Sequence, residues 1–214
     1  MTSPFDILKK YQLPNPKSVI QVGASGGQEL EEFIAAGITD ALLIEPLDGP
    51  FSVLQHRVQN IPSYVPFKAL VSATNGKEFD FYIASNGGQS SSLLEPGDHL
   101  EKFPYVSFPE KIKLTGYRLD SLFAFLISEK RIGFDKAEML YIDVQGAELY
   151  VLRGAGELLE SVQYIWVEIG TGLGYKGAAN YKDIIHYLDI YGYQLIYLEC
   201  DPNNFGDALF VKIA

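Results

Sequence analysis

Residues 138–148, EMLYIDVQGAE, determine how the rest of the chain is interpreted. A short apolar run from Met139 to Ile142 leads directly into Asp143, and Gly146 and Glu148 follow. An apolar run of this length, bounded by turn residues, is typical of a buried strand. An acid at the end of such a strand is either a structural boundary or part of a catalytic edge. The neighbouring segments have to distinguish these alternatives.

The composition of the chain predicts a single domain over residues 1–214, with residues 1–17 as an N-terminal extension. Its formal charge of −10 disfavours binding to nucleic acid or an anionic membrane, because both would repel the average surface. No apolar segment reaches the about 18 residues of a membrane span, and none has the form of a signal peptide. The lone Cys200 cannot form an internal disulfide. We therefore expect a soluble, cytoplasmic protein, with its oligomeric state left open.

Two successive strand–helix units open the chain. The first is an apolar run from Val19 to Val22, a glycine cluster, and a helical pattern that ends at Gly37. The second is a strand over 41–44 followed by a helix that carries Phe51, Leu54 and Val58 on one side. Two such units in succession predict a parallel sheet with right-handed crossovers.

The remaining elements follow from the same patterns. Strands are expected over 64–71, 79–85, 111–117, 139–142 and 162–170, and helices are expected after Asp120 as cap, over 148–153 before Gly154, and after Asn180 as cap. The last two strands, 193–200 and 207–214, should form an antiparallel hairpin because their connection is short. Residues 85–110 fit neither period and are long for a loop, so they are functional or partly disordered. Together with 170–180 they are predicted to be loops on the substrate side.

Three acids fall where strands end: Glu45, Asp143 and Glu168. In an open parallel α/β sheet, ligands bind beyond the carboxyl ends of the strands, so these acids should line one crevice. The glycine turn over residues 23–27 belongs to the same edge and would allow close approach of the backbone to a ligand.

The spacing of the glycines in this turn indicates which class of ligand it could bind. Its glycines stand at 23, 26 and 27, which matches neither the dinucleotide motif G-x-G-x-x-G nor a phosphate-binding P-loop. Glu45 lies about twenty residues further on, where a carboxylate can accept hydrogen bonds from both hydroxyls of a ribose. These two facts favour a nucleoside without phosphates, such as S-adenosylmethionine; a purely structural turn is the alternative.

Seven segments together resemble the FkbM family of S-adenosylmethionine-dependent methyltransferases, from about residue 18 to the end: VIQVGASGGQEL, LLIEPL, SSSLL, YRLDSL, YIDVQGAELYVLRGA, YIWVEI and DALFVKI. The most specific is IDVQGAELYVLRGA, which is similar to the family's D-x-x-G-x-E stretch. The resemblance implies a class I methyltransferase, Rossmann-like α/β fold: a mostly parallel seven-stranded sheet with a C-terminal antiparallel hairpin and helices on both faces. It also implies methylation of hydroxyl groups, often on sugars or natural products. Gln21 and Gln145 stand where acids are common in the family.

The candidate catalytic residues are Asp143, Glu148, Glu168 and His99. Methyl transfer to an alcohol is an in-line displacement, in which alignment can supply roughly 7–11 kcal/mol of the barrier and a base contributes about 10²–10⁴-fold. Asp143 is the first choice as base or as anchor of the acceptor hydroxyl. Glu148 is either catalytic or a helix N-terminal acid, and Glu168 either orients a hydroxyl or closes the edge of the sheet. His99, in the 85–110 segment, is a further candidate base near neutral pH.

The predicted cofactor contacts come from the glycine turn, the second strand, the end of the third strand and the 138–148 stretch: Gln21, Gly23, Ala24, Ser25, Gly27, Glu45, Pro46, Val71, Ser72 and Asp143. Asp143, Glu148 and Glu168 could also hold Mg²⁺ or Ca²⁺, but no spacing signature supports a metal site, so none is predicted.

The sequence predicts an S-adenosylmethionine-dependent O-methyltransferase that acts on a saccharide or another polar small molecule. A non-catalytic module that binds a nucleoside or S-adenosylmethionine is the alternative that Gln21 favours. A nicotinamide-dependent oxidoreductase is a third reading, which the glycine spacing disfavours.

Overall fold

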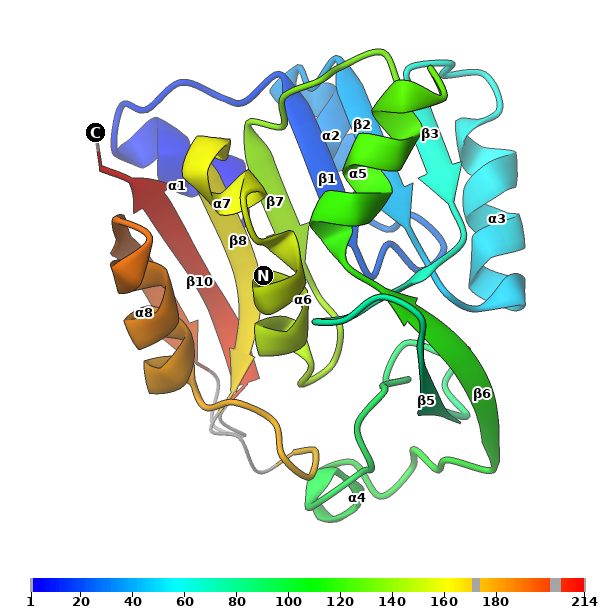
Figure 1. The fold of residues 1–214 in the computed structure, drawn as a ribbon. Coiled ribbons are helices and arrows are strands. Elements are labelled where there is room, and N and C mark those ends of the chain that lie inside the picture. Colours follow the sequence, from blue (N-terminus) through cyan, green and yellow to red (C-terminus); the bar gives the residue numbers. More distant parts are fainter. Residues whose placement is uncertain (1, 171–173, 201–204, 214) are drawn as a thin grey trace.

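The computed structural model describes residues 2–170, 174–200 and 205–213. Within these residues, the main sheet has seven strands in the order β3-β2-β1-β7-β8-β10-β9 (Figure 1). Their bounds are β1 (Ser18–Val22), β2 (Asp40–Ile44), β3 (Tyr64–Phe67), β7 (Met139–Ile142), β8 (Tyr164–Gly170), β9 (Tyr193–Cys200) and β10 (Phe205–Lys212). All neighbours are parallel except β10, which pairs antiparallel with both β8 and β9. The predicted fold class is confirmed.

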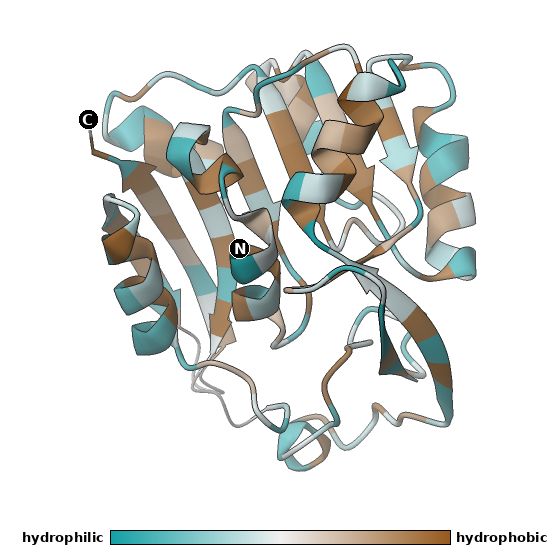
Figure 2. Ribbon diagram, in the orientation of Figure 1, coloured by the Kyte–Doolittle hydropathy of each residue, from teal (hydrophilic) through white to brown (hydrophobic). Residues whose placement is uncertain are grey.

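Helices cover both faces of this sheet. One face carries α5 (Leu119–Ser128), α6 (Glu148–Ala155), α7 (Leu158–Ser161) and α8 (Tyr181–Ile190), and the other carries α1 (Pro4–Lys10), α2 (Leu30–Ala36) and α3 (Asp48–Val58). Each face has its own hydrophobic core, and brown predominates on the central strands in Figure 2, between paler and teal segments. Parallel strands that are covered on both faces need apolar residues at successive positions, which explains why all five residues of β1 are buried.

A second, three-stranded sheet lies beyond the carboxyl ends of the parallel strands, beside the short helix α4 (His99–Lys102) (Figure 1). Its order is β4-β6-β5, with bounds β4 (Leu70–Val71), β6 (Glu110–Tyr117) and β5 (Lys77–Ile83). The prediction of one strand over 64–71 is therefore wrong. β3 ends at the edge of the main sheet, and after two connecting residues the chain pairs with β6 instead.

Helix α1 was not predicted, although residues 1–17 contain its signals. Ser3 caps the helix by accepting a hydrogen bond from Phe5 N at 3.2 Å, and Pro4 occupies the first turn, where its missing N–H costs nothing. Phe5, Ile7 and Leu8 are buried against the sheet. The N-terminal extension is therefore a layer of the domain rather than an appendage.

Two predicted helix boundaries differ from the structure. Asp120 does not cap α5, because the cap position is Arg118, whose Nε donates to Asp120 Oδ1 at 3.0 Å. Gly154 does not end α6, which continues to Ala155; a Cβ atom at Gly154 would lie 2.2 Å from the carbonyl oxygen of Ser72. The glycine thus permits close packing of the helix rather than its termination.

Two other predicted boundaries are confirmed. Asn180 caps α8 by accepting from the backbone N–H groups of Lys182 and Asp183 in a capping box. Gly37, with φ +80°, ends α2 in the left-handed conformation that glycine adopts readily.

Candidate active site

A cavity of about 450 Å³ lies at the carboxyl ends of β1, β2 and β7, in the size range of ligand pockets. Its lining comes from the glycine turn, the two segments that follow β2 and β7, the second sheet and residues 86–93: Val22, Gly23, Ser25, Gln28, Glu29, Ile44, Glu45, Pro46, Leu47, Ala69, Leu70, Val71, Phe81, Asn86, Gly88, Gln89, Ser90, Ser91, Leu93, Asp143, Val144, Gln145 and Ala147. None of these described lining residues is Lys, Arg or His. The predicted convergence of Glu45 and Asp143 at one edge is observed, and their charges meet no basic side chain in the lining.

The glycine turn is held against two neighbouring strands. Gly23 has φ +86°, and a Cβ atom there would lie 1.7 Å from the carbonyl oxygen of Asp143. The N–H groups of Gly23 and Ala24 both donate to the carbonyl oxygen of Ile44 at 3.0 Å. Glycine is therefore required at position 23 for β1 and β7 to converge, whether or not a ligand is bound.

Glu45 is the best-defined polar group of the cavity. It is 5% exposed, and its oxygens Oε2 and Oε1 accept hydrogen bonds at 2.9 Å from the N–H groups of Ser25 and Leu47 respectively. Burial raises the pKa of Glu45 to about 7. A carboxylate has about four acceptor sites, so each oxygen keeps capacity for a ligand hydroxyl. This arrangement suits a vicinal diol such as that of ribose.

One end of the cavity is apolar and can enclose a flat aromatic base. Leu70 and Val71, both expected near the adenine, line this end together with Leu47, Phe81 and Leu93. Ser72, which belongs to the predicted cofactor set, does not reach the cavity. It is fully buried, and its hydroxyl donates to the carbonyl oxygen of Thr74 at 2.9 Å.

Three other predicted cofactor residues stand behind the lining. Ala24 is completely buried in the core beneath α2 and α3. Gly27 packs against Leu30 and Leu54, where a Cβ atom would lie 2.6 and 2.9 Å from their side chains. Gln21 is 1% exposed on β1. These residues shape the turn, whereas Gly23, Ser25, Glu45, Pro46 and Val71 face the cavity as predicted.

Asp143 is bound into a network with Glu168 through Gln145. The Nε2 amide group of Gln145 donates to Asp143 Oδ1 at 2.8 Å and to Glu168 Oε2 at 2.9 Å. Gln145 has φ +57°, a conformation that non-glycine residues rarely adopt, and Gly146 follows with φ +94°. The left-handed turn after β7 therefore places the amide between the two carboxyl groups. Asp143 and Gln145 line the cavity, and Glu168 lies outside its lining.

The protonation of this network follows from its burial. Burial raises the pKa of both carboxyl groups, and the nearby charges of Asp143 and Glu148 raise the pKa of Glu168 further, well above its ordinary value. Hydrogen bonds from Gln145 and Glu168 favour the ionised form of Asp143. A proton shared by the two acids therefore favours Glu168, and Asp143 is the more readily ionised of the pair.

Glu148 is placed behind the cavity lining, against the backbone of the turn that follows β7. The residue is 3% exposed and lies outside the cavity lining, and its Oε1 accepts from the N–H groups of Gly146 at 2.9 Å and Val144 at 3.3 Å. Burial raises its pKa to about 7. Glu148 thus accepts the backbone hydrogen bonds of the turn that carries Gln145. This position agrees with the alternative prediction, in which Glu148 is an acid at the N-terminus of a helix.

His99 is also placed outside the cavity lining. It begins α4, is 3% exposed, and packs among the rings of Phe103, Phe108 and Tyr175 at centroid distances of 4.9, 5.5 and 5.2 Å. Burial lowers its pKa. A neutral imidazole enclosed by aromatic rings cannot reach a substrate from this position, so the geometry opposes its predicted role as a base.

The two predicted loops meet at this site. Residues 86–93 contribute a wall of the cavity, and Tyr175 Oη donates to the carbonyl oxygen of Ser90 at 2.7 Å. The N–H group of Gly97 donates to the carbonyl oxygen of Gly174 at 2.9 Å. The 85–110 segment is therefore ordered by contacts with the second loop, of which residues 171–173 lie outside the described part.

Several lining residues were not predicted, notably Gln28, Glu29, Phe81 and the polar side chains of residues 86–91. Glu29 lies two positions beyond Gly27, so its nearness to the turn was visible in the sequence. The individual residues of 86–91 were not named, although the 85–110 segment that contains them was predicted to be a loop on the substrate side.

A model of the methyltransferase FkbM domain matches residues 14–195. The chain belongs to the FkbM methyltransferase family. The suspected resemblance is thereby confirmed.

Individual relatives are distant. The 2-O-methyltransferase NoeI of Sinorhizobium fredii (strain NBRC 101917 / NGR234) is 23% identical over 189 residues, which cover 85% of this chain and 74% of that protein. A putative tRNA (m1A22) methyltransferase of Streptococcus pneumoniae, Sp1610, has a TM-score of 0.50 at 15% identity, over 99% of this chain and 70% of the other. The methyltransferase domain of a bacterial Hen1 protein has a TM-score of 0.51 at 12% identity, over 96% and 94%. These structures show that the fold is shared.

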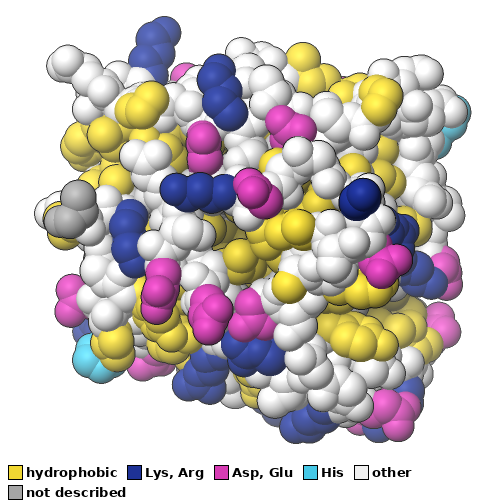
Figure 3. All heavy atoms as spheres, turned by 45° about the horizontal axis from the view of Figure 1, so that its top comes forward, with side chains coloured by type: hydrophobic (Ala, Val, Ile, Leu, Met, Phe, Trp, Pro, Cys, Tyr) yellow, Lys and Arg dark blue, Asp and Glu magenta, His cyan; other side chains and the backbone are white. Residues whose placement is uncertain are grey.

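Within the described ranges, no helix combines the length and apolar character needed to cross a bilayer. In the same part of the chain, no group of three or more His, Cys, Asp or Glu side chains is arranged to hold a metal ion. The face drawn in Figure 3 shows acidic and basic side chains interspersed.

Proposed function

We propose that this methyltransferase is an O-methyltransferase that acts on a hydroxyl group of a saccharide or another polar small molecule. The observation that supports it most is the carboxylate of Asp143 at the cavity wall, hydrogen-bonded by Gln145 and facing no basic lining residue. A hydroxyl is the acceptor group that such an oxygen can both orient and deprotonate.

The described residues fit the cofactor in three regions. Glu45 accepts hydrogen bonds from the ribose, and the apolar end around Leu70, Val71 and Phe81 encloses the adenine. The remaining region, next to Asp143, receives the methionine part. When bound, S-adenosylmethionine supplies a methyl group on a positively charged sulfur.

Asp143 then acts on the acceptor. Its carboxylate accepts a hydrogen bond from the acceptor hydroxyl and aims the oxygen lone pair at the methyl carbon. The cofactor would supply the methyl group to the acceptor oxygen and keep the electron pair of the broken bond on its sulfur, and Asp143 would receive the hydroxyl proton. Glu168 and Gln145 stabilise the carboxylate in this position by hydrogen bonding.

A polar, uncharged acceptor suits the other wall of the cavity. Asn86, Gln89, Ser90 and Ser91 bring amide and hydroxyl groups to it, and such groups can donate to and accept from sugar hydroxyls. The formal charge of −10 disfavours a polyanionic acceptor. NoeI, a distant relative, is named for 2-O-methylation, which agrees with a hydroxyl acceptor.

Binding and transfer are tested separately. Calorimetry with S-adenosylmethionine, S-adenosylhomocysteine and NAD should show binding of the first two and none of NAD. Cofactor with a labelled methyl group is then incubated with neutral mono- and oligosaccharides, and the products are treated with base. Label that survives base treatment marks an ether, whereas label lost as methanol marks a carboxyl ester and would overturn the proposal. Cofactor binding without transfer to any hydroxyl compound would favour the non-catalytic module.

A further inference from the structure

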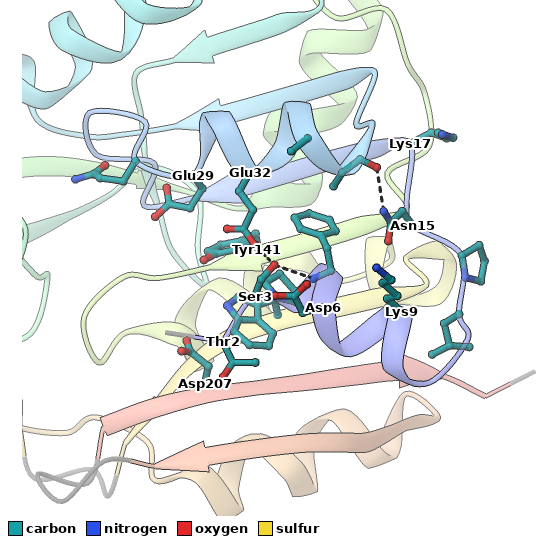
Figure 4. Close-up of a pocket in the computed structure, with 18 residues that line it drawn as sticks. Thr2, Ser3, Asp6, Lys9, Asn15, Lys17, Glu29, Glu32, Tyr141 and Asp207 are labelled. Carbon is teal, nitrogen blue, oxygen red and sulfur yellow. Dashed lines mark hydrogen bonds between the residues drawn. The ribbon is translucent and has the colours of Figure 1, made fainter.

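Glu29 is a half-buried acid in the cavity lining, and neither the ribose contact nor the acceptor chemistry uses it. Its side chain faces both the cofactor cavity and a neighbouring pocket between α1 and α2. In that pocket Glu29, Glu32 and Tyr141 lie side by side (Figure 4). Glu29 Oε2 accepts a hydrogen bond from Gln21 Nε2 at 2.8 Å. A carboxylate thus reaches the cofactor cavity from beside the position where the sequence has Gln21 instead of an acid.

A helix-capping role does not explain Glu29. It occupies the N-cap position of α2, but its side chain makes no capping hydrogen bond in the described part of the chain. The nearby Arg57 is also engaged elsewhere, since its guanidinium donates to Glu31 Oε1 at 2.5 Å and to carbonyl oxygens of the glycine turn. Glu29 is therefore held by a neutral amide, which cannot balance its charge.

Among the described residues, acidic groups act on Glu29, and the lining of the cofactor cavity contains no positive charge that would balance its own. Burial raises its pKa, and the charged groups that act on it, Asp143 and Glu32, are both acids that raise it further. No Lys, Arg or His is among the described residues that line the cofactor cavity. Gln21 Oε1, on the amide that holds Glu29, is a buried oxygen without a hydrogen-bond partner in the described part of the chain. Both observations point to a missing hydrogen-bond donor with a positive charge.

We propose that Glu29 binds the α-ammonium group of the methionine part of S-adenosylmethionine, and that Gln21 is the residue that positions it. In this arrangement each of three carboxylates interacts with a different part of the cofactor. Glu45 takes the ribose, Asp143 faces the methyl group and the acceptor, and Glu29 takes the ammonium group. Glu29 lines the cavity together with Asp143 and lies outside the apolar cluster of Leu47, Leu70, Phe81 and Leu93.

The test compares two ligands that differ in the proposed contact. S-adenosylhomocysteine carries the ammonium group, whereas 5′-methylthioadenosine has the same nucleoside and thioether but no amino acid. For Glu29→Gln we expect calorimetry to show roughly 10- to 100-fold weaker binding of S-adenosylhomocysteine, the loss of one charge-assisted hydrogen bond, and little change for methylthioadenosine. Glu32→Gln is the matched control, because Glu32 lines the neighbouring pocket but not the cofactor cavity. This substitution should change the affinity for neither S-adenosylhomocysteine nor methylthioadenosine.

Gln21→Leu tests the positioning role. We expect it to lower the affinity for S-adenosylhomocysteine relative to methylthioadenosine in the same direction as Glu29→Gln, and we expect Gln21→Asn to recover part of that ratio. Equal weakening of both ligands by Glu29→Gln would mean a distorted turn and would overturn the proposal, as would no weakening at all. The proposal rests on S-adenosylmethionine as the methyl donor, so failure of the unmodified protein to bind either nucleoside would overturn the cofactor assignment too. Normal cofactor binding without methyl transfer would count only against the proposed acceptor chemistry.

Discussion

The backbones of Gly23 and Asp143 lie so close together that a side chain on Gly23 would clash with Asp143. A Cβ atom on Gly23 would lie 1.7 Å from the carbonyl oxygen of Asp143. The backbone conformation of Gly23, at φ +86°, is also one that other residues rarely adopt. The ends of β1 and β7 thus meet at a point where a side chain has no room. The cavity is built around this contact.

Gly23→Ala should consequently cost stability as well as ligand binding. Both the left-handed backbone and the backbone contact oppose the methyl group, so we expect a loss of more than about 2 kcal/mol in the free energy of unfolding. Urea denaturation measures this loss. Gly49→Ala, at a helical position with open space around it, is the control and should be neutral or slightly stabilising. A Gly23→Ala variant as stable as the control would contradict the interpretation.

The stability of the ligand-free protein should fall as pH rises from about 5 to 7.5. Burial raises the pKa of Glu45 and Glu148 to about 7 in the folded state, against about 4.3 in an unfolded chain. The folded state therefore holds these protons more tightly, and the stability they contribute is full below the unfolded pKa and is lost as pH rises through 7. We expect a decrease of roughly 1–3 kcal/mol, measured by denaturation across this range.

Glu45→Gln serves as the control for the pH dependence, because an amide cannot ionise. The variant should show a shallower decline over the same range. A stability that rises steadily from pH 5 to 7.5 would contradict the assignment of buried, proton-retaining acids.

Asp143→Asn should separate catalysis from folding. The amide keeps the size of the side chain and removes the proton acceptor, so we expect at least about a tenfold lower kcat with nearly unchanged cofactor affinity. Glu148→Ala should behave in the opposite way. It leaves the N–H groups of Val144 and Gly146 without their acceptor, which should cost about 1–3 kcal/mol of stability.

These two variants are compared by single-turnover rates at saturating cofactor and by thermal unfolding. If Asp143→Asn turned over at the normal rate while Glu148→Ala lost activity per folded molecule, the catalytic role would move to Glu148.

Residues 86–93 should respond to cofactor binding. They form a wall of the cavity and are tied to the second loop by the hydrogen bond from Tyr175 to Ser90. Hydrogen exchange of their amides should slow by several-fold when S-adenosylhomocysteine is bound, because closure over the ligand reduces local opening. Exchange in α8, on the far side of the sheet from the glycine turn, provides the internal reference. Unchanged exchange in 86–93 would exclude a closing role.

Parts of the site that depend on strand ends could be predicted from sequence, because an apolar run, an acid and a turn are all local features. Glu45 and Asp143 were placed at one edge for this reason, and the structure brings them to one cavity. Glu148 follows the same local pattern, yet it turns back to the backbone of Val144 and Gly146. The direction of an acidic side chain depends on the conformation of the turn that carries it, and the sequence alone does not determine that conformation.

Other features depend on contacts between distant segments. His99 was a candidate base because it lies in a loop, but its surroundings include Tyr175, which is remote in sequence. The strand prediction over 64–71 was wrong because Leu70 and Val71 pair with β6, more than forty residues later. Helix α1 differs from these cases, since Ser3 and Pro4 supplied a local signal.

The position of β10 between β8 and β9 has a consequence for synthesis on the ribosome. β10 follows β9 in the chain, but it occupies the inner place in the sheet and pairs with both neighbours. Until it has emerged, a nascent chain exposes the unpaired edge of β8, a strand that includes the apolar residues Ile165, Trp166 and Val167. Such an edge is a template for pairing with other chains. Ribosome-bound chains arrested after Cys200, which lack β10, should therefore recruit chaperones that chains containing β10 do not.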